Sequence, residues 1–224
     1  MAIKNFKLIQ KNKLTNDVFE LTFKSNEILN SLAGQFITFL LPNGIWWKAY
    51  SILEDNGDNF KLIIKRIENW WWGSKFICDS EVWDTLKWVW PTWKFILQET
   101  NNNKLFFWTW TWFVPLYYQI IESLKKLDCK LKLVFWVRSK EDLFYIEELK
   151  KLEKENENFS FRIFLSWEKI QNYSYWRITS FINTSNIENF SEFYICWNPI
   201  MVDDVEEKLL NLWNKKESIL HEKY

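Results

Sequence analysis

The sequence predicts a two-domain chain, in which a small antiparallel β-barrel precedes an α/β domain built on a parallel sheet. The first part holds short alternating segments separated by turn-forming residues, and the second holds apolar strands that alternate with helical segments. Between them lies Gln98–Lys104, a polar run with three consecutive asparagines that is typical of a linker. We therefore place the domains at residues 1–98 and 103–224. A chain of 224 residues is long enough to bury both cores.

Short segments of the first part predict the strands of the barrel. Most of them carry apolar residues at alternate positions and are bounded by Asn, Asp, Gly or Pro, the residues that favour turns. The predicted strands span residues 7–14, 17–25, 35–41, 49–53, 60–67, 84–90 and 94–97.

The second part predicts strands that are apolar along most of their length, as expected when both faces of a parallel sheet are covered. These strands span residues 104–108, 130–137, 159–165 and 192–197. Helices are predicted at residues 113–127, 142–155 and 201–212. In the first of them Leu116, Ile120, Leu124 and Leu127 share one helical face, and Pro115 lies in the first turn.

Charge and composition exclude several classes of protein. Lys and Arg together number 29, as do Asp and Glu, so the formal net charge of zero argues against a strongly electrostatic nucleic-acid binder. The first residues lack an apolar signal core, and no apolar run is long enough to cross a bilayer, so we expect a cytoplasmic protein without a membrane span. The three cysteines are too dispersed for a disulfide framework or a metal site. His221 is the only histidine, which excludes histidine-based triads and metal sites.

The sequence is unusually rich in tryptophan and unusually poor in glycine. The chain has 17 Trp and 4 Gly, whereas ordinary usage of about 7% would give roughly 16 glycines. Many of the tryptophans stand beside Asn, Asp, Pro, Ser or Thr, in turn contexts that favour glycine and offer tryptophan no advantage. We infer that most of them stand where the functional chain has glycine. This would happen if one codon means glycine in the source organism but was translated as tryptophan.

The stretch "FFWTWTWFVP", residues 106–115, shows what this substitution changes. As written, its Trp–Thr alternation is typical of a half-buried strand. With glycine at the tryptophan positions it becomes "GTGTGFVP", a glycine-rich loop between a strand and a helix. Such a loop lays backbone N–H groups against a phosphate.

With glycine at these positions, six motifs in order resemble the ferredoxin–NADP reductase family over nearly the whole chain. The resemblance implies a Greek-key barrel that binds FAD and a Rossmann-like domain that binds NADP, with NAD as the other option. Two motifs lie in the barrel: "KAYSI", residues 48–52, is similar to the family's Arg-x-Tyr-Ser, and "WWWGSKFI", residues 70–77, is similar to its glycine-rich turn. A third, "WDTLKWVWPTWKFIL", resembles the segment that closes the barrel.

The barrel motifs imply a flavin site. Tyr50 would stack on the flavin ring, with Ala49 beside it in the motif and Ser51 near the flavin N5. Lys48 replaces the family's Arg and keeps the positive charge for a flavin phosphate without the bidentate fork. Gly73 and Ser74 would meet the flavin phosphates. Taken alone, Tyr50 and Ser51 are more typical of an ordinary strand than of a cofactor site, and it is the family context that reverses this interpretation.

The motifs of the second domain imply a dinucleotide site beside the flavin. Its cofactor-binding residues would be Thr109, Trp110 and Thr111 in the pyrophosphate loop, together with Arg138 and Arg177 for a ribose phosphate. Ser166 occupies the family's serine position in "LSWEK", but Trp167 stands where NADP-specific members carry Arg. The two arginines still favour NADP over NAD. Ser139 and Asp142 fit a local capping box.

The resemblance also names the residues at the reacting atoms. Cys196 in "YICWNPIMV" would lie near the nicotinamide, although a buried Cys at a strand end is often only a small apolar residue. "HEKY" ends the sequence as in many family members, with Glu222 as a proton route and Tyr224 covering one face of the flavin. Ser51, Cys196 and Glu222 are therefore the candidate catalytic residues.

The resulting expectation is a flavoprotein oxidoreductase. It would transfer a hydride between NAD(P)H and FAD, and single electrons between the flavin and a separate ferredoxin or flavodoxin, because the chain lacks cysteines for a cluster. One alternative is an NAD(P)H:flavin oxidoreductase that uses free flavin. A second takes the tryptophans literally, as a non-enzymatic module that stacks single-stranded bases or sugars.

Overall fold

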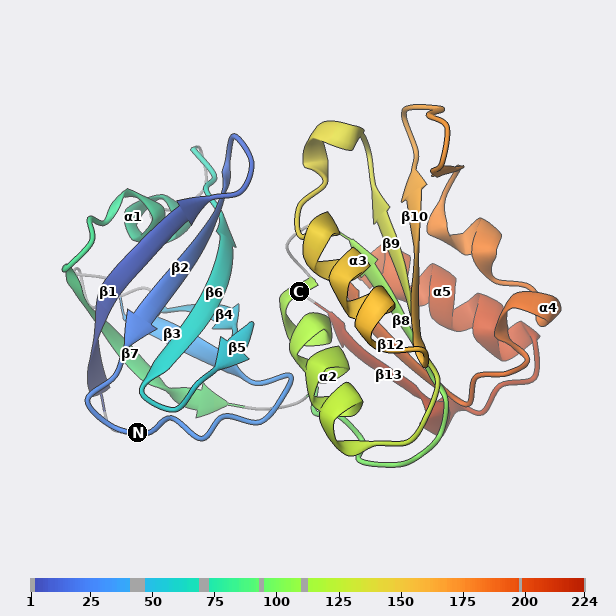
Figure 1. The fold of residues 1–224 in the computed structure, drawn as a ribbon, viewed down its shortest axis with the longest axis horizontal. Helices are drawn as coiled ribbons and strands as arrows, with labels where there is room; N and C mark the ends of the chain where they lie inside the picture. Colours follow the sequence, from blue (N-terminus) through green and yellow to red (C-terminus); the bar gives the residue numbers. More distant parts are fainter. Residues whose placement is uncertain are drawn as a thin grey trace. The chain divides into compact units, whose positions relative to one another are not determined.

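The structure is a computed structural model that describes residues 3–40, 47–68, 73–92, 95–109, 113–197 and 199–223. It divides into two compact units: Met1–Leu97 with Tyr117–Gln119, and Gln98–Leu116 with Ile120–Tyr224. The first unit contains an antiparallel sheet and the second a parallel sheet with helices (Figure 1), which confirms the predicted fold class. The boundaries 1–98 and 103–224 stay a prediction about independently folding domains.

Within its described residues, the first unit is a seven-stranded antiparallel barrel with one short helix, α1 (Gly73–Asp79). Its strands are β1 (Ile3–Lys13), β2 (Val18–Lys24), β3 (Phe36–Leu40), β4 (Trp47–Ser51), β5 (Glu54–Asp55), β6 (Asn59–Lys65) and β7 (Thr85–Thr92). They pair in the order β4-β3-β7-β1-β2-β6-β5. Alternate residues point inward as the sequence pattern predicts, so that Phe6, Phe23 and Phe60 are buried together.

One predicted strand of the barrel, at residues 94–97, does not form. Residues 95–97 are outside any strand, and Lys94 lies outside the described residues. Phe95 and Leu97 are buried, and the Leu97 N–H donates to the Ala33 carbonyl at 3.3 Å. The alternation of apolar residues here therefore reflects the burial of a connecting segment and not pairing with another strand.

The second unit has a six-stranded parallel sheet with helices on both of its faces (Figure 1). Its strands are β8 (Lys104–Thr109), β9 (Leu131–Val137), β10 (Phe159–Leu165), β11 (Ser174–Tyr175), β12 (Glu192–Trp197) and β13 (Ile219–Lys223). The order is β11-β10-β9-β8-β12-β13. From β8 the chain builds outward in one direction and then returns to add β12 and β13 on the other side. The topological switch point therefore lies between β8 and β12.

The helices of this unit follow the predicted pattern with one exception. α2 (Phe113–Lys126) and α5 (Pro199–Asn211) lie within a few residues of the predicted bounds, and a short helix α4 (Thr184–Ile187) precedes β12. The helix predicted at 142–155 is divided, because α3 covers only Ile146–Glu155 and follows a 3-10 turn at Lys140–Asp142. The break has a local cause: the backbone N–H and Oγ of Ser139 donate to the Asp142 carboxylate at 3.2 and 3.1 Å. This is the predicted Ser139–Asp142 cap, and it closes the turn before the helix starts.

The polar run before β8 is bound to the second unit. Asn101 and Asn103 accept the backbone N–H groups of Asp128 and Lys130 at 3.1 and 2.8 Å. Asn102 donates to Glu192 at 2.9 Å. The fully buried Lys104 ammonium lies 3.0 Å from the Glu192 carboxylate. The run that the composition predicts to be a linker is therefore a fixed part of this unit.

Candidate functional site

The candidate site residues of the barrel start with the consecutive residues Lys48 to Ser51 on β4. Antiparallel pairing sets Phe39 opposite Lys48 and Ile37 opposite Tyr50. Tyr50 is half-buried, and its ring meets the edge of Phe39 with centroids 5.8 Å apart. Burial raises the pKa of its hydroxyl, with a smaller contribution from Cys78. Tyr50 is thus a neutral aromatic ring held in one orientation.

Lys48 lies against the start of helix α1. A Cβ at position 73 would come within 2.8 Å of the Lys48 Cγ, so that only glycine lets the lysine stem pass so close. Ser74 follows in the first turn of α1, and its Oγ accepts the Ile67 N–H at 3.3 Å. The structure therefore brings together Lys48, Gly73 and Ser74, which the resemblance assigns to the flavin phosphates. A cation beside backbone N–H groups at a helix start suits an anionic group.

The candidate site residues of the second unit lie at the carboxyl ends of the parallel strands. Thr109 ends β8 and is buried, and Cys196 precedes the last residue of β12. These strands flank the switch point, where ligands of open parallel sheets bind. Trp110 and Thr111 of the predicted pyrophosphate loop lie outside the described residues. The strand before the loop and the helix after it form as predicted.

Cys196 and Glu222 are neighbours across two strands. Parallel pairing of β12 with β13 sets them in direct register. Cys196 is fully buried, and burial, followed by the nearby Glu222 carboxylate, raises the pKa of its thiol well above the usual range. Cys196 is therefore a neutral thiol beside a carboxylate. Tyr224, the third residue predicted at this point, lies outside the described residues.

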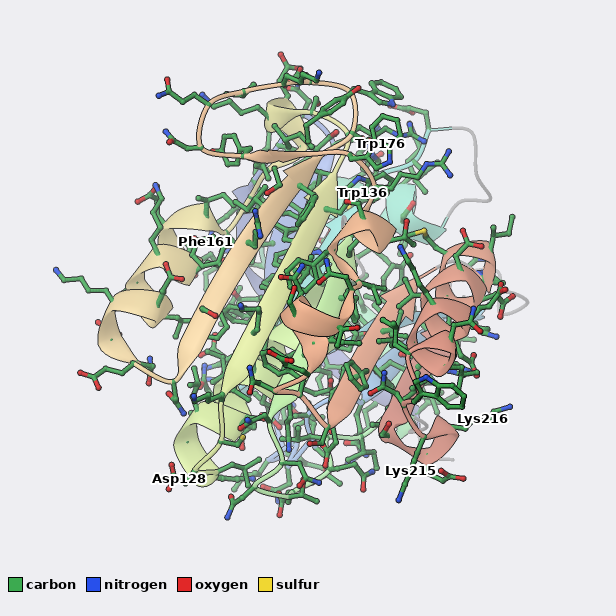
Figure 2. All side chains as sticks on the ribbon, turned by 90° about the vertical axis from the view of Figure 1, so that its right-hand side faces the viewer. Asp128, Trp136, Phe161, Trp176, Lys215 and Lys216 are labelled. Atoms are coloured by element: carbon green, nitrogen blue, oxygen red, sulfur yellow. The ribbon has the colours of Figure 1, made fainter. Side chains whose placement is uncertain are left out.

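The two predicted phosphate-binding arginines both follow strands of the parallel sheet, Arg138 after β9 and Arg177 after β11. Arg138 follows β9, and its guanidinium lies over the Trp167 ring at 4.9 Å from the centroid. The Trp167 N–H donates to the Arg138 carbonyl at 3.0 Å, which ties the loops after β9 and β10 together. Arg177 is exposed and begins a 3-10 turn at Ile178–Phe181. Trp136 and Trp176 mark this end of the sheet, and Asp128 marks the opposite end (Figure 2).

Sequence reasoning did not single out Glu168, which belongs to the same edge. Its carboxylate accepts the Lys140 N–H at 3.1 Å and joins the loop after β10 to that after β9. An acidic residue three positions after the end of a parallel strand was the available signal.

Metal clusters and membrane-spanning helices are both absent from the described residues. Across these ranges, no group of three or more His, Cys, Asp and Glu side chains could hold a metal ion. In the same ranges, no helix has the length and apolar character that crossing a membrane requires.

Known proteins resemble part of the chain in sequence. No protein-family model matches it. The chain is 31% identical over 141 residues to a component of the Na(+)-translocating NADH-quinone reductase of Haemophilus ducreyi, a match that covers 58% of this chain and 34% of that relative. The chain thus spans about a third of the length of the curated relatives that it matches.

Solved structures match over almost the entire chain. A ferredoxin NADP+ reductase from Neisseria gonorrhoeae, solved with bound FAD and NADP, superposes with a TM-score of 0.85 at 19% identity, covering 100% of this chain and 99% of that one. An Amycolatopsis cytochrome P450 reductase gives a TM-score of 0.90 at 17% identity, covering 99% of this chain and 69% of that one. The chain has the same two-domain fold as these proteins.

Proposed function

We propose that this chain, which has the two-domain fold of the ferredoxin–NADP reductase family, is an oxidoreductase that transfers a hydride between NAD(P)H and FAD. The observation that carries the proposal is the arrangement of Lys48, Tyr50 and Gly73 in the barrel. A half-buried aromatic ring and a cation against a glycine at a helix start match the two ends of a flavin nucleotide, its ring and its phosphates.

Each of the candidate side chains has a separate role in this reaction. When bound, FAD supplies the redox chemistry, since it accepts a hydride and can release electrons singly. Tyr50 offers a fixed aromatic face, and Lys48 neutralises phosphate charge next to Gly73. Glu222 holds or delivers a proton beside Cys196, whose buried neutral thiol keeps water away from the reacting end.

The dinucleotide would bind at the switch point of the second unit. Thr109 begins the phosphate loop, and Arg138 and Arg177 supply cations at the same edge for a ribose phosphate. These arginines favour NADPH as the donor. The name of the Haemophilus ducreyi relative refers to NADH, so both donors belong in the assay.

The electron partner is a separate ferredoxin or flavodoxin, and the protein acts in the cytoplasm. The only cysteines, Cys78, Cys129 and Cys196, are all buried and come from separate elements. They give no ligand set for a cluster within the chain. Free flavin as the acceptor is the second candidate, favoured by the lysine in place of the family's bidentate Arg at position 48.

A tryptophan-based binding module is a weaker alternative. Trp88 and Trp108 are fully buried, and the exposed Trp83, Trp167 and Trp213 come from loops of both units. Within the part of the chain that the structure describes, the tryptophans do not line one strand face as a stacking platform requires.

The test compares the chain as written with a version that has glycine at all 17 tryptophan positions. We expect the glycine version to purify yellow and to lose its visible flavin absorbance after addition of NADPH or NADH. Indoles at 108, 110 and 112, at the end of β8 and in the loop that follows it, would fill the space that phosphates need, so the chain as written should not respond. Equal bleaching by both versions would contradict the need for glycine, and a colourless glycine version would contradict the flavin assignment.

The acceptor is tested with the same protein. Reduction of ferredoxin or flavodoxin should be faster than reduction of free flavin, and should slow with added salt if charged surfaces steer the encounter. Faster turnover with free flavin, together with loss of colour on desalting, would support the flavin-reductase alternative.

A further inference from the structure

Three tryptophans have backbone conformations that belong to glycine. The φ angles are 86° at Trp83, 116° at Trp176 and 65° at Trp213. Positive φ brings the Cβ of an L-residue against its own backbone, and bulky side chains are outliers there. Two true glycines of the chain, Gly57 and Gly34, have φ angles of 85° and 100°, close to those of Trp83 and Trp176.

The other positive-φ residues do not share this property. Asn30 and Asn172 are of the type that tolerates the left-handed region. Tyr145 has a φ of 61°, inside the narrow left-handed range that L-residues can reach, which extends from about 50° to 70°. Trp83 and Trp176 lie beyond that range, whereas Trp213 at 65° lies inside it and is assigned from its position after helix α5 instead.

Trp213 occupies the position after helix α5 at which glycine ends helices. Its N–H donates to the Leu210 carbonyl at 3.0 Å, and the N–H of Asn214 donates to the Leu209 carbonyl at 3.3 Å. This pair of bonds defines the Schellman motif, whose left-handed residue is usually glycine. The Trp213 side chain is 96% exposed, so no packing of the indole compensates for the conformation.

Trp83 is the third residue of a tight turn. The Asp84 N–H donates to the Glu81 carbonyl at 3.0 Å, which closes the turn over Val82 and Trp83. Of the two central residues only Trp83 has positive φ. This combination defines a type II turn, which requires glycine or asparagine at its third residue.

Trp176 follows the short strand β11. Its N–H donates to the Leu165 carbonyl at 3.1 Å, which fixes the backbone at the edge of the sheet. The side chain is 58% exposed, and Figure 2 shows it at the same end of the sheet as Trp136. The backbone bond therefore holds a φ that only glycine adopts without strain.

One buried tryptophan lacks room for its indole. The Trp88 and Phe39 ring centroids are 2.9 Å apart, and the Trp88 Nε1 is buried without a hydrogen-bond partner among the described residues. Aromatic pairs pack with centroids about 4.5–7 Å apart. Glycine at position 88 would remove this overlap.

We propose that residues 83, 176 and 213 are glycines in the functional protein, and that the codon translated as tryptophan at these positions specifies glycine in the source organism. The proposal rests on backbone conformation, and residue counts play no part in it. It does not depend on the proposed function, since none of the three positions belongs to the predicted cofactor contacts.

The experiment compares Gly, Ala and Trp at each position in turn. The background is the full chain with glycine at the other sixteen tryptophan positions, and the readout is the urea-unfolding equilibrium followed by circular dichroism. Alanine is the decisive comparison, because it relieves the bulk of the indole but keeps the Cβ. Trp167 is the matched control: it is 70% exposed but is not among the positive-φ residues.

At positions 83, 176 and 213 we expect the folding equilibrium constant to be about fivefold or more higher with Gly than with Ala, because a Cβ is disfavoured at these angles. At the control position, Trp167→Gly should be no more stable than Trp167→Ala. Glycine at an ordinary φ only increases the conformational freedom of the unfolded chain. Equal stability of Gly and Ala at the three positions would overturn the proposal. So would failure of the glycine background to fold where the chain as written does.

The coding DNA provides the second readout. The three positions should share a single codon with most of the other tryptophan positions, and that codon should be one that other organisms read differently. Ordinary tryptophan codons at 83, 176 and 213 would overturn the proposal whatever the flavin assays give.

Discussion

The two units of the molecule each hold candidate site residues, and each unit assembles its own set in a different way. In the barrel, Lys48 to Ser51 are consecutive residues of β4, and only Gly73 and Ser74 come from another element. In the parallel unit, Thr109, Arg138, Cys196 and Glu222 stand at or after the ends of four different strands. A contiguous motif therefore defines the first part, whereas strand order defines the second.

Because of this difference, different kinds of substitution should impair the two sets of residues. The barrel part depends on individual side chains, so single substitutions there should change cofactor retention. The parallel part depends on a buried framework that keeps β8 and β12 side by side, so substitutions in that framework should change stability, and substitutions at the strand ends should change turnover.

The largest expected effect comes from breaking the buried ion pair of the parallel unit. Lys104→Met leaves the Glu192 carboxylate without its 3.0 Å partner in a buried position. Unpaired buried charges are costly, so the free energy of unfolding should fall by about 3–5 kcal/mol. Urea unfolding of the glycine version measures it.

The matched control lies in the barrel. Lys61 and Glu54 form a pair at 2.8 Å whose side chains are 31% and 40% exposed. Lys61→Met should therefore cost only about 0–1 kcal/mol. Similar losses for the two variants would show that the parallel unit does not depend on its buried pair.

The next effect concerns turnover at the strand ends. Glu222→Gln removes the ionisable group beside Cys196 but keeps its shape. We expect ferredoxin-dependent turnover to fall roughly 100-fold, as for the loss of a general acid or base, while flavin content stays unchanged. Glu217→Gln, an exposed residue of the same unit, should retain full activity. Loss of flavin from the Glu222 variant would instead assign this residue to cofactor binding.

A smaller effect is expected in the barrel, where it concerns the binding of flavin instead of turnover. Tyr50→Ala should weaken flavin binding by about 1 kcal/mol or more, because a stacked aromatic face is lost. Tyr50→Phe keeps the ring and should bind normally. Equilibrium dialysis measures both variants, and unchanged affinity in Tyr50→Ala would remove Tyr50 from the flavin site.

The smallest expected effect is a pH dependence of stability. Burial opposes the charge of Glu192, but hydrogen bonds from Thr100, Asn102 and Lys104 outweigh it and lower the pKa of this carboxyl. The unfolded chain then binds the proton first, at a pKa of about 4.3. The stability that the ionised Glu192 carboxylate contributes is fully present above that pH. It is lost as the pH falls through the lower pKa of the folded state.

Unfolding experiments between neutral and acidic pH test the direction of this pH dependence. In Glu192→Gln the acid loss of stability should be shallower than in the parent. The exposed Asp79 of the barrel also has a lowered pKa, held mainly by hydrogen bonds from Arg66. Its contribution should shrink in high salt while that of Glu192 persists. An unchanged acid slope in the Glu192 variant would refute the assignment.

The sequence predicts the long periodic elements and the contiguous motif. α2 and α5 are amphipathic and therefore visible at helical spacing, and the alternation in β4 is visible at a spacing of two. β5 and β11, each of two residues, were not predicted, because pairing with a neighbouring strand creates them. β13 combines two apolar residues with a charged end and has no clear strand pattern by itself.

The candidate site was predictable only in part for the same reason. Lys48, Tyr50 and Gly73 follow from local motifs. The pairing of Cys196 with Glu222 depends on the register between two parallel strands, which the short, weakly patterned strand β13 does not specify by itself. The pairing of Lys104 with Glu192 likewise requires that β8 and β12 be neighbours.

The docked asparagine run determines where the chain can be lengthened. Polar surface loops ordinarily accept insertions, and "TNNN" has the composition of such a loop. Here Asn101, Asn102 and Asn103 each bond to another part of the second unit, so extra residues among them would detach β8 from its turn contacts. Insertions among the asparagines are therefore expected to destabilise the second unit, although the composition of the run would suggest tolerance.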